Sequence, residues 1–139
     1  MRYKIGYTTG VYDLFHIGHV NILRRAKEMC DYLIVGVSLD ELVSYKHKKH
    51  VISFEERIEI VRSVRYVDEA VAQADMDKLS AWERLKFNVM FVGDDWKESD
   101  KWKEYESQFK AVGVDVIYFP YTKNTSSTLI NNVLLNLRA

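Results

Sequence analysis

The chain has 139 residues, 47% of them hydrophobic and 29% charged, which fits one globular domain spanning residues 1–139 and leaves no room for a second. Twenty Lys and Arg residues balance twenty Asp and Glu residues, so no overall electrostatic field favours nucleic acid or an anionic membrane. We therefore expect neither partner, and any site for an anion must be local.

The single cysteine, Cys30, excludes an internal disulfide framework and a zinc cluster built from cysteines. We expect Cys30 to be a small buried apolar residue. Nowhere do about 18 apolar residues run together, as a membrane-spanning helix requires. These features predict a soluble protein of the reducing cytoplasm.

Apolar segments of strand length alternate with amphipathic segments of helix length, which predicts βαβ units and a parallel sheet. We expect an α/β domain with a five-stranded parallel sheet flanked by helices. The expected strands are 4–8, 32–37, 67–72, 89–92 and 114–119. The expected helices are 18–29, 53–63, 77–85, 101–112 and 126–137. The second and fourth strands are almost wholly apolar, which favours places at the sheet centre.

Two of these helices have clear start signals. Ser53 is followed three residues later by Glu56, the spacing of a capping box, and Asp77 precedes another helical run. Trp82, Trp102, Tyr105 and Phe109 recur at helical spacing, and we interpret them as packing residues.

The first expected strand leads into a segment with two histidines, His16 and His19, which flank Gly18 at the expected start of a helix. Ligands of open α/β sheets bind beyond the carboxyl ends of the strands, and helix N-termini attract phosphate. Two imidazoles there could donate hydrogen bonds to a phosphoryl group in its transition state. A purely structural histidine pair is the alternative, and a zinc pair is disfavoured because no third ligand follows at a suitable spacing.

Two other segments that follow strands carry polar groups. Gly93-Asp94-Asp95-Trp96 brings two carboxylates and an indole to the ligand end, unless it is only a polar turn with Trp96 in the core. The run 122–128 offers hydroxyl and amide groups at the start of the last helix. The segment 38–49 is long and ends in a basic cluster, which suggests a loop for an anionic acceptor.

Residues 16–19 read HIGH, and the segment 10–19 resembles the G-x-F-D-L-x-H-x-G-H signature of the cytidylyltransferase family, with Tyr12 in place of phenylalanine. This family belongs to the nucleotidyltransferases that share the HIGH motif with class I aminoacyl-tRNA synthetases. The branch that acts on glycerol 3-phosphate is the most similar. Similar segments run along nearly the whole chain, at 31–41, 46–48, 56–57, 65–69 and 93–96. The resemblance implies a single Rossmann-like domain.

The resemblance also implies roles for individual residues. The implied catalytic residues are His16, His19 and Lys46, with both histidines stabilising the α-phosphate while a phosphate oxygen of the acceptor attacks and pyrophosphate leaves. The implied nucleotide-binding residues are Thr9, Gly10, Val11, Tyr12, Asp13, Gly18, Gly93, Asp94, Asp95, Trp96, Thr122, Ser126, Ser127 and Thr128. The implied acceptor-phosphate residues are Asp40, Lys46, Lys48, Arg57 and Arg65, although solvated surface positions are the alternative for the basic ones.

The similarity weakens at 121–128, where the family has R-T-E-G-I-S-T-T. Tyr121 and Asn124 replace the arginine and the glycine, and we hypothesise that Lys123 supplies the missing cation. Val11 likewise stands where glycerol-3-phosphate enzymes have threonine. These departures bear on the acceptor and, to a lesser degree, on the base.

The function implied by the resemblance is transfer of CMP from MgCTP to a phosphorylated alcohol, glycerol 3-phosphate by default, giving a CDP-linked product for a surface polymer or capsule. Choline, ethanolamine, ribitol and glutamine-type phosphates stay open as acceptors. The alternatives are an adenylyltransferase that uses ATP and a non-catalytic nucleotide-binding regulatory module. Mg²⁺ is expected to be held mainly by triphosphate oxygens, with no metal-binding residues of the chain itself. The family also implies a homodimer.

Overall fold

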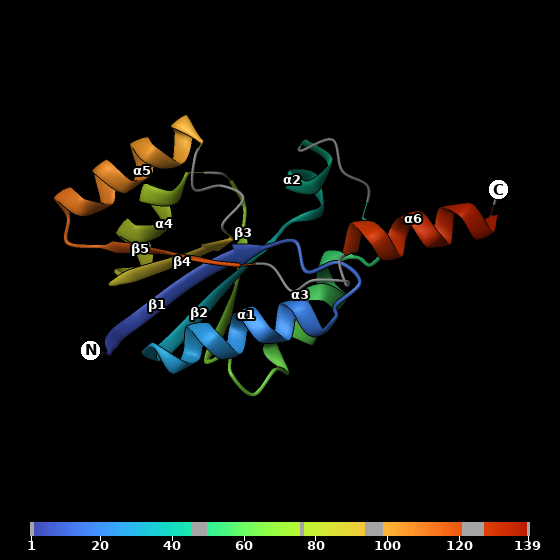
Figure 1. The fold of residues 1–139 in the computed structure, drawn as a ribbon, viewed down its shortest axis with the longest axis horizontal. Helices are drawn as coiled ribbons and strands as arrows, with labels where there is room; N and C mark the ends of the chain where they lie inside the picture. Colours follow the sequence, from blue (N-terminus) through green and yellow to red (C-terminus); the bar gives the residue numbers. More distant parts are fainter. Residues whose placement is uncertain (1, 46–49, 76, 94–98, 121–126, 139) are drawn as a thin grey trace.

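Five parallel strands form one sheet in the order β3-β2-β1-β4-β5 (Figure 1). The computed structural model describes residues 2–45, 50–75, 77–93, 99–120 and 127–138. The strands are β1 (Tyr3–Gly10), β2 (Cys30–Ser38), β3 (Glu69–Gln73), β4 (Val89–Gly93) and β5 (Asp115–Phe119). β1 is central, and the apolar strands β2 and β4 lie directly beside it.

Helices cover both faces of this sheet. α1 (Ile17–Glu28) and α3 (Phe54–Arg62) pack on one face, where Leu23 and Val61 are fully buried. α4 (Lys78–Leu85) and α5 (Asp100–Ala111) pack on the other, where Phe109 is fully buried. The short α2 (Asp40–Tyr45) follows β2, and α6 (Ser127–Arg138) ends the described chain. No helix among the described residues is long and apolar enough to cross a membrane.

The alternation of elements and most of their boundaries agree with the prediction to within two residues. The aromatic residues interpreted as packing do pack on the α4 and α5 face, and Cys30 is buried. The helix α2 differs from the prediction, because the sequence suggests only a loop for the segment 38–49. The predicted Ser53 capping box is also wrong: Ser53 precedes α3 but its side chain makes no capping hydrogen bond. The carboxylate of Asp40 accepts the Phe54 N–H instead, at 3.0 Å.

The strand order places a topological switch point between β1 and β4. From β1 the chain proceeds outward through β2 and β3, then returns to the other side of β1 for β4 and β5. Ligands of open α/β sheets bind in the crevice that forms beyond the carboxyl ends of the strands at such a point. The segment between β1 and α1 lies there.

Candidate active site

The turn between β1 and α1 has an unusual backbone. Tyr12 and Leu14 adopt the left-handed region with φ of 57° and 50°, which costs free energy for side chains of this size. The ring of Tyr12 is buried and packs edge-on against His19, with ring centroids 5.3 Å apart. A Cβ atom at Gly10 would lie 2.9 Å from this ring, so Gly10 leaves the space that the ring needs. The turn therefore packs an aromatic ring under the second histidine.

His16 and His19 cap the start of α1 reciprocally. The Nδ1 atom of His16 accepts the Gly18 N–H at 3.0 Å, and the Nδ1 atom of His19 accepts the His16 N–H at 3.2 Å. The backbone N–H of His19 also bonds to the carbonyl of His16, at 3.0 Å. We expected free amides of this helix start to face the phosphate, but the Gly18 and His19 amides are used within the cap.

These bonds assign the tautomers of both rings. A neutral imidazole whose Nδ1 accepts a hydrogen bond carries its proton on Nε2. Burial lowers the pKa of His16. Burial and, to a smaller extent, the neighbouring His16 lower the pKa of His19 to about 4, against an opposing effect of Asp13. Near neutral pH the pair therefore presents two neutral rings, each with an Nε2–H donor.

The two rings lie close together, with centroids 4.1 Å apart and planes inclined by 30°. This arrangement fixes two hydrogen-bond donors beside each other at the switch point of the sheet. Fixed donors stabilise negative charge that spreads over a phosphoryl group in its transition state. Neutral rings with Nδ1 already occupied are suited to donating hydrogen bonds through Nε2 and poorly suited to abstracting a proton.

A buried lysine, which the sequence analysis missed, lies at the same end of β1. Lys78 is only 4% exposed, and its Nζ atom lies 3.2 Å from the Oγ1 atom of Thr9, one of the predicted nucleotide-binding residues. In the sequence Lys78 follows the helix-capping residue Asp77 and resembles an ordinary first-turn surface residue. The position of Lys78 in the sequence could have revealed it. Lys78 begins the helix that follows β3, and a lysine there can reach the carboxyl end of the sheet.

Arg57 and Asp13 are turned into the protein. We expected Arg57 at the acceptor phosphate, but its side chain is fully buried and its guanidinium donates to three backbone carbonyls and to Asp40. The Asp13 carboxylate, expected to bind nucleotide, accepts backbone N–H groups from Leu14, Val51 and Ile52. These expectations are corrected: both residues, and Asp40 with them, hold loops together.

Arg65 lies at the other end of the sheet. It falls between the end of α3 and the start of β3, and its guanidinium contacts the side chain of Tyr66. Nearby Asp68 accepts the Leu33 N–H near the start of β2, which places this segment at the amino ends of the strands. In a single copy of the chain, Arg65 therefore lies at the end of the sheet opposite to the histidine pair, and not where the acceptor phosphate is expected.

Several predicted site residues lie outside the described residues: Lys46, Lys48, Asp94, Asp95, Trp96, Thr122 and Ser126. Gly93 ends β4 beside β1, as expected for this edge of the sheet. Ser127 and Thr128 begin α6. Val11 adjoins the turn, and its carbonyl is one of those that Arg57 binds.

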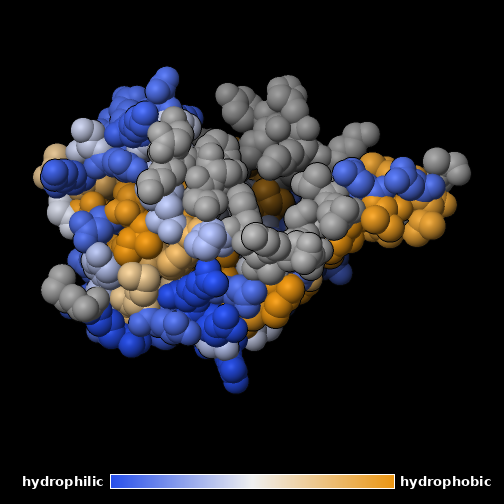
Figure 2. All heavy atoms as spheres, viewed as in Figure 1, coloured by the Kyte–Doolittle hydropathy of each residue, from blue (hydrophilic) through white to orange (hydrophobic). Residues whose placement is uncertain are grey.

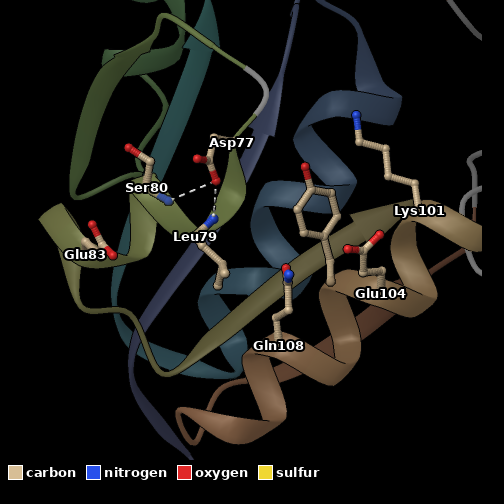
Figure 3. Close-up of a pocket in the computed structure, with 8 residues that line it drawn as sticks. Asp77, Leu79, Ser80, Glu83, Lys101, Glu104 and Gln108 are labelled. Atoms are coloured by element: carbon tan, nitrogen blue, oxygen red, sulfur yellow. Dashed lines mark hydrogen bonds between the residues drawn. The ribbon is translucent and has the colours of Figure 1, made fainter.

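Among the described residues, no group of three or more His, Cys, Asp or Glu side chains could hold a metal ion. A cavity of about 540 Å³ lies between α4 and α5 (Figure 3), and Asp77, Glu83 and Glu104 are among the residues that line it. These carboxylates would repel a triphosphate. The residues around His16 and His19 are not part of its lining, so the histidine pair is the better candidate site.

The fold and the histidine pair define a nucleotidyltransferase of the α/β class, and comparison with known proteins identifies the family. The model of the cytidylyltransferase-like family matches residues 7–133, and the chain belongs to this family. The protein is an enzyme, and the resemblance of the HIGH segment to the cytidylyltransferase family is confirmed.

Individual relatives show how far the similarity extends. A glycerol-3-phosphate cytidylyltransferase of Staphylococcus aureus is 39% identical over 91% of this chain and 92% of its own length. An ethanolamine-phosphate cytidylyltransferase of Arabidopsis thaliana is 34% identical over 98% of this chain and 34% of its own length. An FAD synthase of Thermococcus kodakarensis is 34% identical over 81% of this chain and 76% of its own length.

The fold is also found in solved structures. The crystal structure of a lipopolysaccharide core biosynthesis protein from Thermoplasma volcanium superposes with a TM-score of 0.73 at 22% identity, covering 88% of this chain and 99% of that one. The predicted Rossmann-like architecture is confirmed.

Proposed function

We propose that the protein transfers CMP from MgCTP to the phosphate of glycerol 3-phosphate and releases pyrophosphate. The observation that carries the proposal is the pair of imidazoles at the switch point, whose Nδ1 atoms both accept backbone N–H groups, so that each neutral ring carries its proton on Nε2. The match to the glycerol-3-phosphate enzyme over nine-tenths of both chains supports the choice of donor and acceptor.

In the proposed reaction an acceptor phosphate oxygen forms a bond to the α-phosphorus of CTP. The bond between that phosphorus and the bridging oxygen to the β-phosphate breaks, and pyrophosphate leaves with the electron pair. The attacking oxygen is already ionised, so no base is needed and positioning supplies most of the catalysis. His16 and His19 would donate hydrogen bonds to the oxygens of the α-phosphate.

The acceptor phosphate needs a cation of its own. We propose that Lys78, a buried cation at the carboxyl end of β1, contributes to this subsite together with Lys46 and Lys48. Mg²⁺ would enter with the nucleotide, held mainly by its triphosphate oxygens. We further propose a cytoplasmic enzyme whose CDP-linked product serves a surface polymer or capsule.

The experiment that tests the proposal offers the purified protein MgCTP or MgATP with each of several phosphorylated alcohols. Pyrophosphate release and the mass of the product are measured. We expect turnover with CTP and glycerol 3-phosphate above that with ethanolamine, choline or ribitol phosphates. The similarity to an FAD synthase, whose product contains adenine, makes adenylyl transfer the second candidate, and turnover with ATP alone would establish it.

We also propose that the enzyme is a homodimer, with α6 as a contact. This helix projects along the long axis of the molecule, and hydrophobic residues gather along one of its sides (Figures 1 and 2). Val133 and Leu137, which lie on this side four residues apart, are 50% and 76% exposed. A 12-residue helix is marginally stable in water without tertiary packing. Residues 127–137 carry no charge, so a second copy could cover this side without electrostatic repulsion.

A further inference from the structure

Arg57 links four segments at the carboxyl end of the sheet. Its Nη1 atom donates to the carbonyls of Val11 at 2.7 Å and Ser38 at 2.8 Å. Its Nε atom donates to the carbonyl of Ile52 at 2.9 Å, and its Nη2 atom donates to the Asp40 carboxylate at 2.6 Å. The side chain is 0% exposed. A guanidinium with this many protein acceptors has no free face for a substrate phosphate.

Asp13 joins two of these segments, the turn after β1 and residues 51–52. One carboxylate oxygen accepts the Val51 N–H at 2.7 Å, and the other accepts the Ile52 N–H at 2.9 Å. Ile52 is therefore held at both ends of its backbone, since its N–H binds Asp13 and its carbonyl binds Arg57. We call Arg57, Asp13 and Asp40, with the backbone groups that they bind, the loop clamp.

The loop clamp acts on the strained turn. Val11 and Asp13 alternate with Tyr12 and Leu14, the two residues with positive φ. A strained backbone persists where surrounding contacts over-determine it. The same turn delivers His16 as the N-cap of α1, so its shape sets the direction of both imidazoles.

We infer that Arg57 is a positioning residue for nucleotidyl transfer: through the loop clamp it holds the turn 11–15 in its strained form and so aims the Nε2–H donors of His16 and His19. This inference rests on the proposed function and deepens it. Arg57 then does not bind the acceptor phosphate but orients the groups that stabilise the transition state. Loss of the clamp would lower kcat while leaving ground-state binding of both substrates largely intact, because the donors would remain present but misaligned.

The test compares Arg57→Lys with Arg62→Lys, a matched control on the same helix whose side chain is 52% exposed and pairs with Glu59. A lysine cannot reproduce the fork that serves four acceptors. We expect Arg57→Lys to lower kcat by about 10- to 100-fold with KM for CTP and for the acceptor within about threefold of the wild-type values. Arg62→Lys should match the wild type.

Amide hydrogen exchange gives a readout that does not depend on activity. We expect the Val51 and Ile52 amides to exchange faster in Arg57→Lys while sheet amides such as that of Val35 keep their protection. If Arg57→Lys does not fold, Asp40→Asn takes its place, since it keeps the shape of the partner and removes its charge.

Two results would overturn the inference. A raised KM for the acceptor at unchanged kcat would mean that Arg57 binds the acceptor phosphate directly, and an unchanged kcat and exchange pattern would mean that the clamp positions nothing. If the wild type and Arg62→Lys both fail to turn over CTP, the proposed function fails, and the exchange measurement still decides whether the clamp holds the turn.

Discussion

The Nδ1 atom of His19 accepts the backbone N–H of His16 at 3.2 Å, so each histidine of the pair depends on the other for its orientation. His16 in turn caps the helix that carries His19. Because both Nδ1 atoms accept hydrogen bonds, each neutral ring carries its proton on Nε2, the atom that we propose donates to the substrate. The cap of α1 and the proposed catalytic donors are thus the same two side chains. Because capping uses Nδ1 and the proposed catalysis uses Nε2, a substitution that keeps only the capping acceptor separates the two roles.

The His16→Asn variant separates capping from catalysis. An asparagine side chain places an oxygen near the position of Nδ1 and can accept the Gly18 N–H, but it has no donor at the position of Nε2. We expect unfolding free energy within about 0.5 kcal/mol of the wild type and a loss in kcat of about 100-fold. Thermal denaturation and steady-state kinetics measure the two effects.

The control is His16→Ala, which should lose the same activity and in addition about 1 kcal/mol of stability. Full activity in His16→Asn would show that the imidazole serves the helix alone.

The second prediction concerns pH. Burial, with the neighbouring His16, lowers the pKa of His19 from 6.5 to about 4. Protonation would place a hydrogen on Nδ1 and break the bond from the His16 N–H, so kcat should be constant near neutral pH and fall as His19 takes up a proton well below 6.5. A rate profile between about pH 4 and pH 8 checks this. A kcat that rises as the pH falls through this range would mean that an imidazolium is the active form.

The free energy of unfolding should also fall as the pH falls. The unfolded state, with His19 near its ordinary pKa, binds a proton before the folded state does. The contribution of neutral His19 is therefore fully present above pH 6.5 and is lost as the pH falls toward 4, by at most about 3 kcal/mol. Urea unfolding at several pH values measures it, with His19→Gln as the control that should flatten this part of the profile.

Sequence patterns predicted the sheet, its helices and the histidine pair because each rests on local periodicity or a short contiguous motif. Arg57 shows where this reasoning ends. Its place in α3 suggested a surface cation for an acceptor, whereas its real partners at Val11, Ser38 and Ile52 are backbone carbonyls, which no side-chain pattern records. Lys78 was missed because its partner, Thr9, is 69 residues away. Such long-range contacts become visible only when the strands are ordered in the sheet.

The third prediction tests Lys78 as a cation of the acceptor subsite. Lys78→Met keeps most of the volume of the buried chain and removes the charge beside Thr9. We expect KM for glycerol 3-phosphate to rise about tenfold and KM for CTP to change less than about twofold, because only one substrate loses an ionic contact. Lys86→Met is the control at the C-cap residue that follows α4, where Lys86 contacts the ring of Trp82 instead. Equal effects on both KM values would remove Lys78 from the acceptor subsite.

The last prediction addresses α6. Replacing Val133 with aspartate puts a charge on a residue of the apolar side that is 50% exposed, so the folded monomer should tolerate it. A charge in an apolar contact between two copies would be desolvated without a partner, which disfavours association. We expect light scattering coupled to size exclusion to give a dimer for the wild type and a monomer for Val133→Asp. Asn132→Asp adds the same charge to an exposed polar position of this helix and should remain dimeric. If the wild type is itself monomeric at micromolar concentration, or if both variants remain dimers, α6 is not the contact between copies.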